Sequence, residues 1–319
     1  MVIANAVNSV VEMLVVMALG FFLAGSKFYR ENRAKQVLNQ YLSAVAIPVY
    51  LFYNVWSSFS TRTELLATLA KLLIPVAVIL AQYLIGFILC RFLRVQAGRQ
   101  GAFIDACALS NVVFLGFPVM ISMFGEQVIP DGMVYYIANT LLFWTLGTYL
   151  LRVDGGQKKG FFRRENLICI LSPAMIGLLV GVAVRLIGLP LPGFFATAVK
   201  NVSATCSPLG LLFVGASIRS AKPFDRSFSR DIAVLFTARY LVMPVLLGLL
   251  FLILPIAAQS RQVFYILALM PAMTQLGIMA HRYHSDSEFT GAWIALSSVI
   301  GIVTIPLFAW LLQNVFIYN

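Results

Sequence analysis

The segment 105–120, with the sequence DACALSNVVFLGFPVM, is apolar enough to enter a lipid bilayer but poorly suited to a continuous helix. Pro118 lacks a backbone N–H and its ring clashes with the preceding turn, and Gly116 lowers helix propensity. The side chains of Ser110 and Asn111 compete for backbone hydrogen bonds. We therefore expect an interrupted helix at membrane depth, where irregular backbone is tolerated only if it is buried in protein or lines a wet cavity. The alternative is a proline-kinked helix that serves packing alone.

The composition is that of an all-α membrane protein. Hydrophobic residues make up 61% of the 319 positions and charged residues only 11%, which is outside the range of soluble domains. The net charge of +11 does not indicate a nucleic-acid partner, because the basic residues lie between apolar segments rather than along one face. The four cysteines lie in apolar segments without metal-binding spacing, so neither a metal nor a cofactor is predicted.

Ten apolar segments have lengths of about 20 residues, which suffices to cross a hydrocarbon core of about 30 Å. They are 2–24, 36–56, 72–90, 102–124, 133–151, 167–187, 194–218, 232–254, 263–280 and 289–316. Most of the 23 Lys and Arg residues lie in the connections that follow odd-numbered segments. The positive-inside rule then places these connections in the cytoplasm and both termini outside. We predict a multi-pass protein of the cell (inner) membrane.

The two halves of the chain share short matches that lie about 160 residues apart. The matches are SAVAIPVYL at 43–51 with SATCSPLGL at 203–211, Leu115-Gly116 with Leu276-Gly277, and Gly20 with Gly181. We therefore predict two five-helix repeats, 1–153 and 167–319, joined by a cytoplasmic connector at 154–166. Because five is an odd number, the second repeat should be inverted in the membrane relative to the first.

A second break is predicted in segment 263–280, which is the counterpart in the second repeat of segment 102–124 in the first. Residues 270–280, MPAMTQLGIMA, place Pro271 and Gly277 on either side of Thr274 and Gln275. Matching interruptions in two inverted halves indicate a binding site at the membrane midplane. Two broken helices that cross would present half-helix N-termini, with unpaired N–H groups and positive dipole ends, to the crossing point. Such a point favours an anion.

The sequence NVVFLGFP at 111–118 resembles the Asn-x-x-Phe-Leu-Gly-x-Pro motif of the auxin efflux carrier family, which includes plant auxin exporters and bacterial malonate and malate permeases. Met270-Pro271, AHRY at 280–283 and IGIVTIP at 300–306 are similar to the last two helices of that family. The resemblance implies ten helices in two inverted repeats. It further implies a scaffold domain, 2–56 with 167–218, and a transport domain with crossing helices, 66–151 with 232–316. It also implies that small organic anions are carried by an elevator-like movement.

The candidate substrate-binding residues are Asn111, Ser110, Gly116, Pro118, Pro271, Thr274, Gln275 and Ser207. Asn111 is the first choice, because its amide can donate to a carboxylate and is costly to bury unpaired. An equally good interpretation is that Asn111 satisfies backbone groups freed by Pro118. Ser207 could face the cavity, although serines in membrane helices more often serve helix packing.

Three ionisable residues are candidates for coupling, because charges within a membrane are costly and usually functional. They are Asp105, Glu12 and Arg239, and each is expected to lie nearer a membrane surface than the centre. Snorkelling, or a structural pair between Asp105 and Arg239, is an equally good interpretation.

The predicted function is secondary transport of small organic anions such as malonate, malate or auxin-like acids. A sodium-coupled carrier like the bile acid symporters is the alternative, although a sodium site needs several oxygen ligands and the nearby acid is the shallow Asp105. The alternatives from a different functional class are an intramembrane enzyme and a receptor. The sequence contains no Gly-x-Ser-x-Gly or His-Glu-x-x-His motif and no paired intramembrane Asp, so no catalytic residue is predicted and the chain is not expected to be an enzyme. The anion, the coupling ion, the direction of transport and the oligomeric state, with a homodimer as one option, stay open.

Overall fold

The computed structural model describes residues 2–27, 29, 34–59, 61–157, 172–220 and 229–314, and these residues form helices without named strands. Most of the predicted connector 154–166 lies outside the described residues. The helices without a major break are α1 (Val2–Gly25), α3 (Ala34–Tyr41), α4 (Ile47–Ser58), α5 (Arg62–Ala70), α6 (Leu73–Phe92), α9 (Ile129–Leu142), α10 (Thr148–Asp154), α12 (Pro173–Ile187), α13 (Gly193–Ala204), α14 (Cys206–Ser220), α15 (Ser229–Thr237), α16 (Met243–Ile253) and α19 (Ser287–Asn314). Two pairs of shorter helices complete the fold: α7 (Gln100–Ala108) with α8 (Phe117–Phe124), and α17 (Ala258–Ala268) with α18 (Thr274–Arg282).

Four helical stretches of the described chain are long and apolar enough to cross a membrane. They are Arg62–Phe92, Gly193–Arg219, Ser229–Ile253 and Ser287–Leu312. Shorter apolar helices occupy Val11–Gly25, Val112–Phe124 and Pro173–Ile187. Fewer uninterrupted spans are found in the described residues than the ten predicted. Segments 102–124 and 263–280 are each split into two helices, and the start of segment 167–187 lies outside the described residues.

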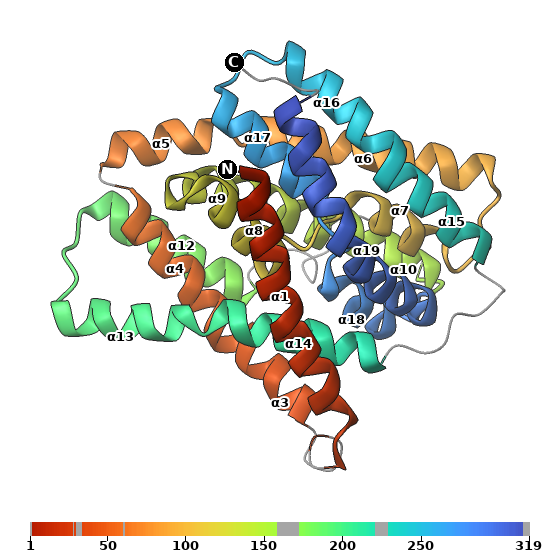
Figure 1. The fold of residues 1–319 in the computed structure, drawn as a ribbon, viewed down its shortest axis with the longest axis horizontal. Helices are drawn as coiled ribbons and strands as arrows, with labels where there is room; N and C mark the ends of the chain where they lie inside the picture. Colours follow the sequence, from red (N-terminus) through yellow and green to blue (C-terminus); the bar gives the residue numbers. More distant parts are fainter. Residues whose placement is uncertain are drawn as a thin grey trace.

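Two helix pairs meet through glycine and form one side and the centre of the molecule in Figure 1. α1 packs along α14, where Gly20 lies against the backbone carbonyl of Leu212. α12 packs along α4, where Gly181 lies against the backbone of Phe52. A side chain at either glycine would collide with the facing backbone, so these residues permit the close approach that membrane helices use for packing.

In the described part of the chain, four π-helical turns widen the helices, and three of them directly precede an X-Pro step. These are η1 (Leu42–Ala46), η2 (Val112–Gly116) and η6 (Ala238–Val242), followed by Pro48, Pro118 and Pro244; the fourth is η4 (Phe143–Gly147). A proline ring clashes with the carbonyl four residues earlier, and a turn with hydrogen bonds five residues apart relieves that clash. The break predicted within 105–120 therefore lies upstream of Gly116 and Pro118, at Leu109–Asn111, and includes the predicted contributors Ser110 and Asn111.

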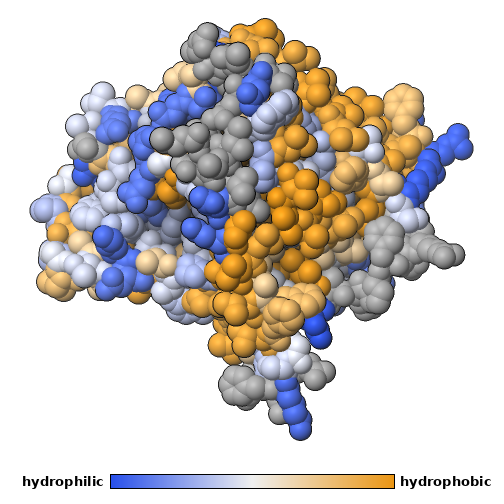
Figure 2. Space-filling model, in the orientation of Figure 1, coloured by the Kyte–Doolittle hydropathy of each residue, from blue (hydrophilic) through white to orange (hydrophobic). Residues whose placement is uncertain are grey.

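The outer surface is apolar over a broad area. Figure 2 shows hydrophobic residues covering the face of the molecule that carries α1 and α16. On α1, Val15, Leu19 and Phe22 are more than half exposed, and on α16 the most exposed side chain is Ile253 at 79%. An exposed apolar surface of this extent is expected for a protein in contact with lipid.

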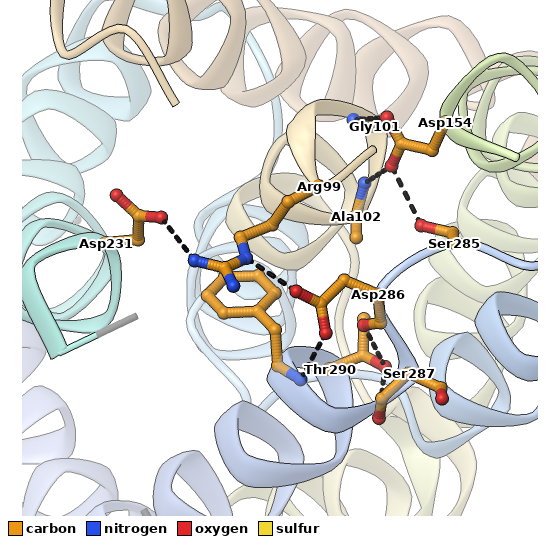
Figure 3. Close-up of polar contacts among 10 residues, drawn as sticks. Arg99, Gly101, Ala102, Asp154, Asp231, Ser285, Asp286, Ser287 and Thr290 are labelled. Carbon is orange, nitrogen blue, oxygen red and sulfur yellow. Dashed lines mark hydrogen bonds and ion pairs between the residues drawn. The ribbon is translucent and has the colours of Figure 1, made fainter. Parts of the chain in front are cut away.

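A cluster of charged residues joins the starts of α7, α15 and α19 (Figure 3). Arg99 donates from Nε to Asp286 Oδ2 at 2.7 Å and from Nη1 to Asp231 Oδ2 at 3.0 Å, and its guanidinium lies 5.3 Å from the ring centroid of Phe289. Asp154, at the end of α10, accepts from the first N–H groups of α7, where a negative charge is favoured by the helix dipole.

Replacing Arg99 by alanine should destabilise the protein, because Asp231 and Asp286 would lose their shared cation in a mostly buried position. Removal of one partner of a buried ion pair costs about 3 to 5 kcal/mol. The change is measured as a fall in the thermal unfolding midpoint of the purified protein. Arg91→Ala, which removes an exposed arginine in the last turn of α6, is the control. Equal midpoints for the two variants would contradict the role of the Arg99 cluster.

Candidate functional site

The two interrupted helices meet at their breaks. α7 ends at Ala108 and η2 begins at Val112, while α17 ends at Ala268 and α18 begins at Thr274. The N–H of Asn111 donates to the carbonyl of Pro271 at 2.8 Å, and Ser110 forms an isolated antiparallel bridge with Ala272. The predicted break in each helix and the contact between the breaks are thus present in the structure.

Backbone groups freed by the breaks are paired by side chains from other helices. Asn139 of α9 accepts from the N–H of Ser110 with Oδ1 and donates to the Ser110 carbonyl with Nδ2, both at 3.2 Å. Ser110 Oγ donates to the carbonyl of Ala268 at 3.1 Å, and Ser297 Oγ of α19 accepts from the N–H of Ala272 at 3.1 Å. Irregular backbone can persist within an apolar protein only with partners of this kind.

Arg239 of η6 binds both breaks at once. Its side chain is 0% exposed. Nη1 donates to the carbonyls of residues 106 and 107 at 3.2 and 2.7 Å. Nη2 donates to the carbonyls of residues 109 and 270 at 3.0 and 2.7 Å, and to Ser110 Oγ at 2.8 Å. The guanidinium therefore satisfies acceptors at the C-terminal ends of both half-helices.

A pocket with an empty volume of about 660 Å³ opens beside the crossing. It is lined by Ser43, Ile47, Ser110, Asn111, Val112, Val113, Phe114, Tyr136, Asn139, Thr140, Trp144, Ser172, Pro173, Ala174, Met273, Thr274 and Gln275. The first residues of α18 belong to this lining, and no side chain caps that helix N-terminus. Its first N–H groups have no partner within the helix, as at any helix N-terminus.

Asn111 combines the two roles that its sequence position suggested. Its Oδ1 accepts from the N–H of Phe114 at 3.3 Å and so caps η2. Its Nδ2 is buried, and no described residue accepts a hydrogen bond from it. Because a buried amide nitrogen without a partner is costly, this donor is available to a ligand in the pocket that Asn111 lines.

The pocket brings together four of the predicted substrate-binding residues, namely Ser110, Asn111, Thr274 and Gln275. Gly116, Pro118, Pro271 and Ser207 are absent from its lining. Gly116 lies against the side chain of Leu267, and a Cβ at this position would collide with it. Pro271 acts through its carbonyl in the crossing, and Ser207 is half-buried in the first turn of α14.

No ion pair joins any two of the three coupling candidates among the described residues. Arg239 is fully buried and does not pair with Asp105, because its donors point to the carbonyls and the hydroxyl of the breaks, so the pair that was offered as an alternative is not formed. Asp105 is 0% exposed, accepts from the hydroxyl of Tyr83 at 2.9 Å, and has no described partner for Oδ2. Glu12 is exposed on α1.

Sequence reasoning missed Asn139 and the place of Arg239. Asn139 carried a usable signal, since an amide in the middle of an apolar segment usually forms a hydrogen bond with another helix. The partners of Arg239 carried none, because most of them are backbone carbonyls on other helices, and a carbonyl is present at every position of the chain.

Replacing Asn139 by leucine should destabilise the crossing, because the N–H and C=O of Ser110 would be left buried without partners. Each unpaired group costs about 1 to 3 kcal/mol. Thermal unfolding of purified protein measures the loss, and Asn201→Leu on the exposed face of α13 is the control. An unfolding midpoint for Asn139→Leu as high as that of the control would show that Asn139 does not support the break.

Comparison with known proteins identifies relatives along nearly the whole chain. Residues 5–160 and 162–309 match a family described as membrane transport protein. An uncharacterized transporter of Methanothermobacter thermautotrophicus is 25% identical over 312 residues, which cover 97% of this chain and 99% of that protein. An uncharacterized transporter of Methanocaldococcus jannaschii is 23% identical over 313 residues, which cover 96% and 98% respectively.

Proposed function

This chain belongs to the membrane transport protein family, the auxin efflux carrier family that its motifs resemble, and we propose that it carries small organic anions such as malonate, malate or auxin-like acids by secondary transport. The family and the relatives are transporters, so the general function follows from membership. The class of substrate and the mechanism are proposed from the geometry of the pocket.

The observation that carries the proposal is the set of unpaired donors at the helix crossing. The first residues of α18, whose N-terminus has no side-chain cap, line the pocket. Asn111 also lines it, and its Nδ2 has no partner among the described residues. The positive end of a helix dipole and free N–H groups bind anions. Among the described residues, the lining contains no Asp or Glu that would repel a carboxylate. Behind the pocket, Arg239 donates to Ser110 and adds a fixed positive charge.

The walls of the pocket suit a small organic molecule, because small-molecule sites combine apolar side chains with a few placed polar groups. Ile47, Phe114 and Trp144 supply apolar wall opposite the polar groups. This combination accommodates a carboxylate that carries either a short chain or a ring.

The elevator mechanism is supported by the position of the pocket between the two proposed domains. Ser43, Ile47 and 172–174 belong to the scaffold, 2–56 with 167–218. The residues at 110–114, 136–144 and 273–275 belong to the transport domain, 66–151 with 232–316. Movement of one domain along the other would carry the crossing, with its bound anion, relative to the scaffold.

Two helix contacts support the proposed inverted repeat of five and five helices. Gly20 lies against the backbone of Leu212, and Gly181 lies against the backbone of Phe52. Gly20 and Gly181, and likewise Phe52 and Leu212, are about 160 positions apart, the spacing of the sequence matches. Each contact thus maps onto the other when the repeats are exchanged, as a two-fold axis in the membrane plane requires.

The proposed orientation places both termini outside the cell membrane. Ser43 and Ser172 line the pocket and lie within the first turns of segments 36–56 and 167–187, which begin on the proposed cytoplasmic side. Because both serines lie in the cytoplasmic half of their proposed spans, we propose that the pocket is reached from the cytoplasm, as in an inward-facing state.

The test replaces Asn111 by aspartate. Aspartate keeps an oxygen that can cap η2, but it replaces the free donor by an acceptor that repels a carboxylate. Loss of a charge-assisted hydrogen bond of about 1.5 to 3 kcal/mol predicts at least a tenfold rise in KM. Uptake of labelled malonate, malate and indole acetate into proteoliposomes measures this change.

Asn201→Asp, on an exposed helix face away from the pocket, should transport as the wild type does. Failure of the wild-type protein to move any carboxylate of the panel would overturn the proposed substrate class. An unchanged KM for Asn111→Asp would remove Asn111 from the site.

A further inference from the structure

Nη1 and Nη2 of Arg239 lie in a cage of five oxygens, whereas its buried Nε has no partner among the described residues. The guanidinium donates to four backbone carbonyls, at residues 106, 107, 109 and 270, and to the hydroxyl oxygen of Ser110. Each of these N···O distances is 3.2 Å or shorter. None of the ion pairs recorded for the described residues involves Arg239. Its charge is therefore balanced by carbonyl dipoles rather than by a carboxylate.

This cage has the chemistry of a site for a small inorganic cation. Sodium and calcium take oxygen ligands, and backbone carbonyls are common among them. In carriers with interrupted helices, the coupling cation is held by unwound backbone and by the C-terminal ends of half-helices. Here the ends of α7 and α17 supply those carbonyls, and the negative ends of both helix dipoles point toward the same guanidinium.

We propose that Arg239 is a tethered cation that occupies the place of a bound inorganic cation at the helix crossing. The guanidinium is covalently attached to the chain and therefore cannot dissociate from the crossing. It therefore holds the two breaks together through the whole transport cycle without loading or releasing an ion. The proposal deepens the proposed function, because it removes the structural need for sodium in a carrier built on this crossing.

The geometry also connects Arg239 to the substrate pocket. Nη2 donates to Ser110 Oγ, and Ser110 lines the pocket beside Asn111. A fixed positive charge behind this wall favours an anion in front of it. The cation that stabilises the breaks is thus also a positioning group for the residues that meet the substrate.

The test uses purified protein without substrate, so that failure of the anion-transport proposal leaves it intact. Arg239→Ala removes the guanidinium and leaves the five oxygens around a cavity. We expect its unfolding midpoint in choline chloride to fall by about 10 °C, as for loss of a buried charge from a network. Sodium or guanidinium ions at millimolar concentration, at constant ionic strength, should restore a large part of the fall, because either can enter the cage.

Two matched variants separate this role from ordinary packing. Arg239→Met fills the same space with an apolar side chain, so it should be destabilised but insensitive to the choice of cation. Arg62→Ala, which removes an exposed arginine at the start of α5, should behave as the wild type does. Equal midpoints of Arg239→Ala in sodium, guanidinium and choline chloride would overturn the proposal.

The wild-type protein supplies a second test that does not depend on a variant that folds. Its unfolding midpoint, and its uptake of any carboxylate that it transports, should be the same in sodium chloride and choline chloride. A sodium-specific rise in either quantity would show that an inorganic cation is still required and would overturn the role of Arg239.

Discussion

Hydrogen bonding of the backbone at two helix breaks is the constraint on which the rest of this structure depends. An unpaired buried N–H or C=O costs about 1 to 3 kcal/mol, and a broken helix frees several of each. Arg239 pairs carbonyls of both breaks, Asn139 pairs both backbone groups of Ser110, and Ser297 pairs the N–H of Ala272. Three further helices are thereby fixed around the crossing.

The same contacts explain why donors rather than acceptors face the pocket. Arg239 consumes the acceptors at the C-terminal ends of α7 and α17, whereas no side chain caps the N-terminus of α18. Asn111 Oδ1 accepts a hydrogen bond at the start of η2, whereas its Nδ2 has no partner among the described residues. The residual electrostatic character of the crossing is therefore positive, which favours an anion over a cation.

Proline has two different effects in this fold. Pro118 follows a π-helical turn and continues the helix, because the wider turn accommodates its ring. Pro271 lies within a stretch that is not helical, and its carbonyl accepts the N–H of Asn111 from the other break. The distinction matters for the site, because the pocket is built around the break at Leu109–Asn111 and not around the proline of the 111–118 motif.

The sequence by itself determined that the protein is a helical membrane protein, that two of its segments are interrupted, and that Ser110, Asn111, Thr274 and Gln275 are the polar residues of those interruptions. These features are local, since they follow from glycine, proline and polar side chains within one apolar run. Only the tertiary structure decided that Arg239 lies at the crossing, that Asn139 supports it, and that Gly116 packs against Leu267 instead of lining the pocket. Those contacts join different helices, between 29 and 151 positions apart in the chain. Which carbonyl meets which side chain depends on how the helices pack, which no local pattern of residues encodes.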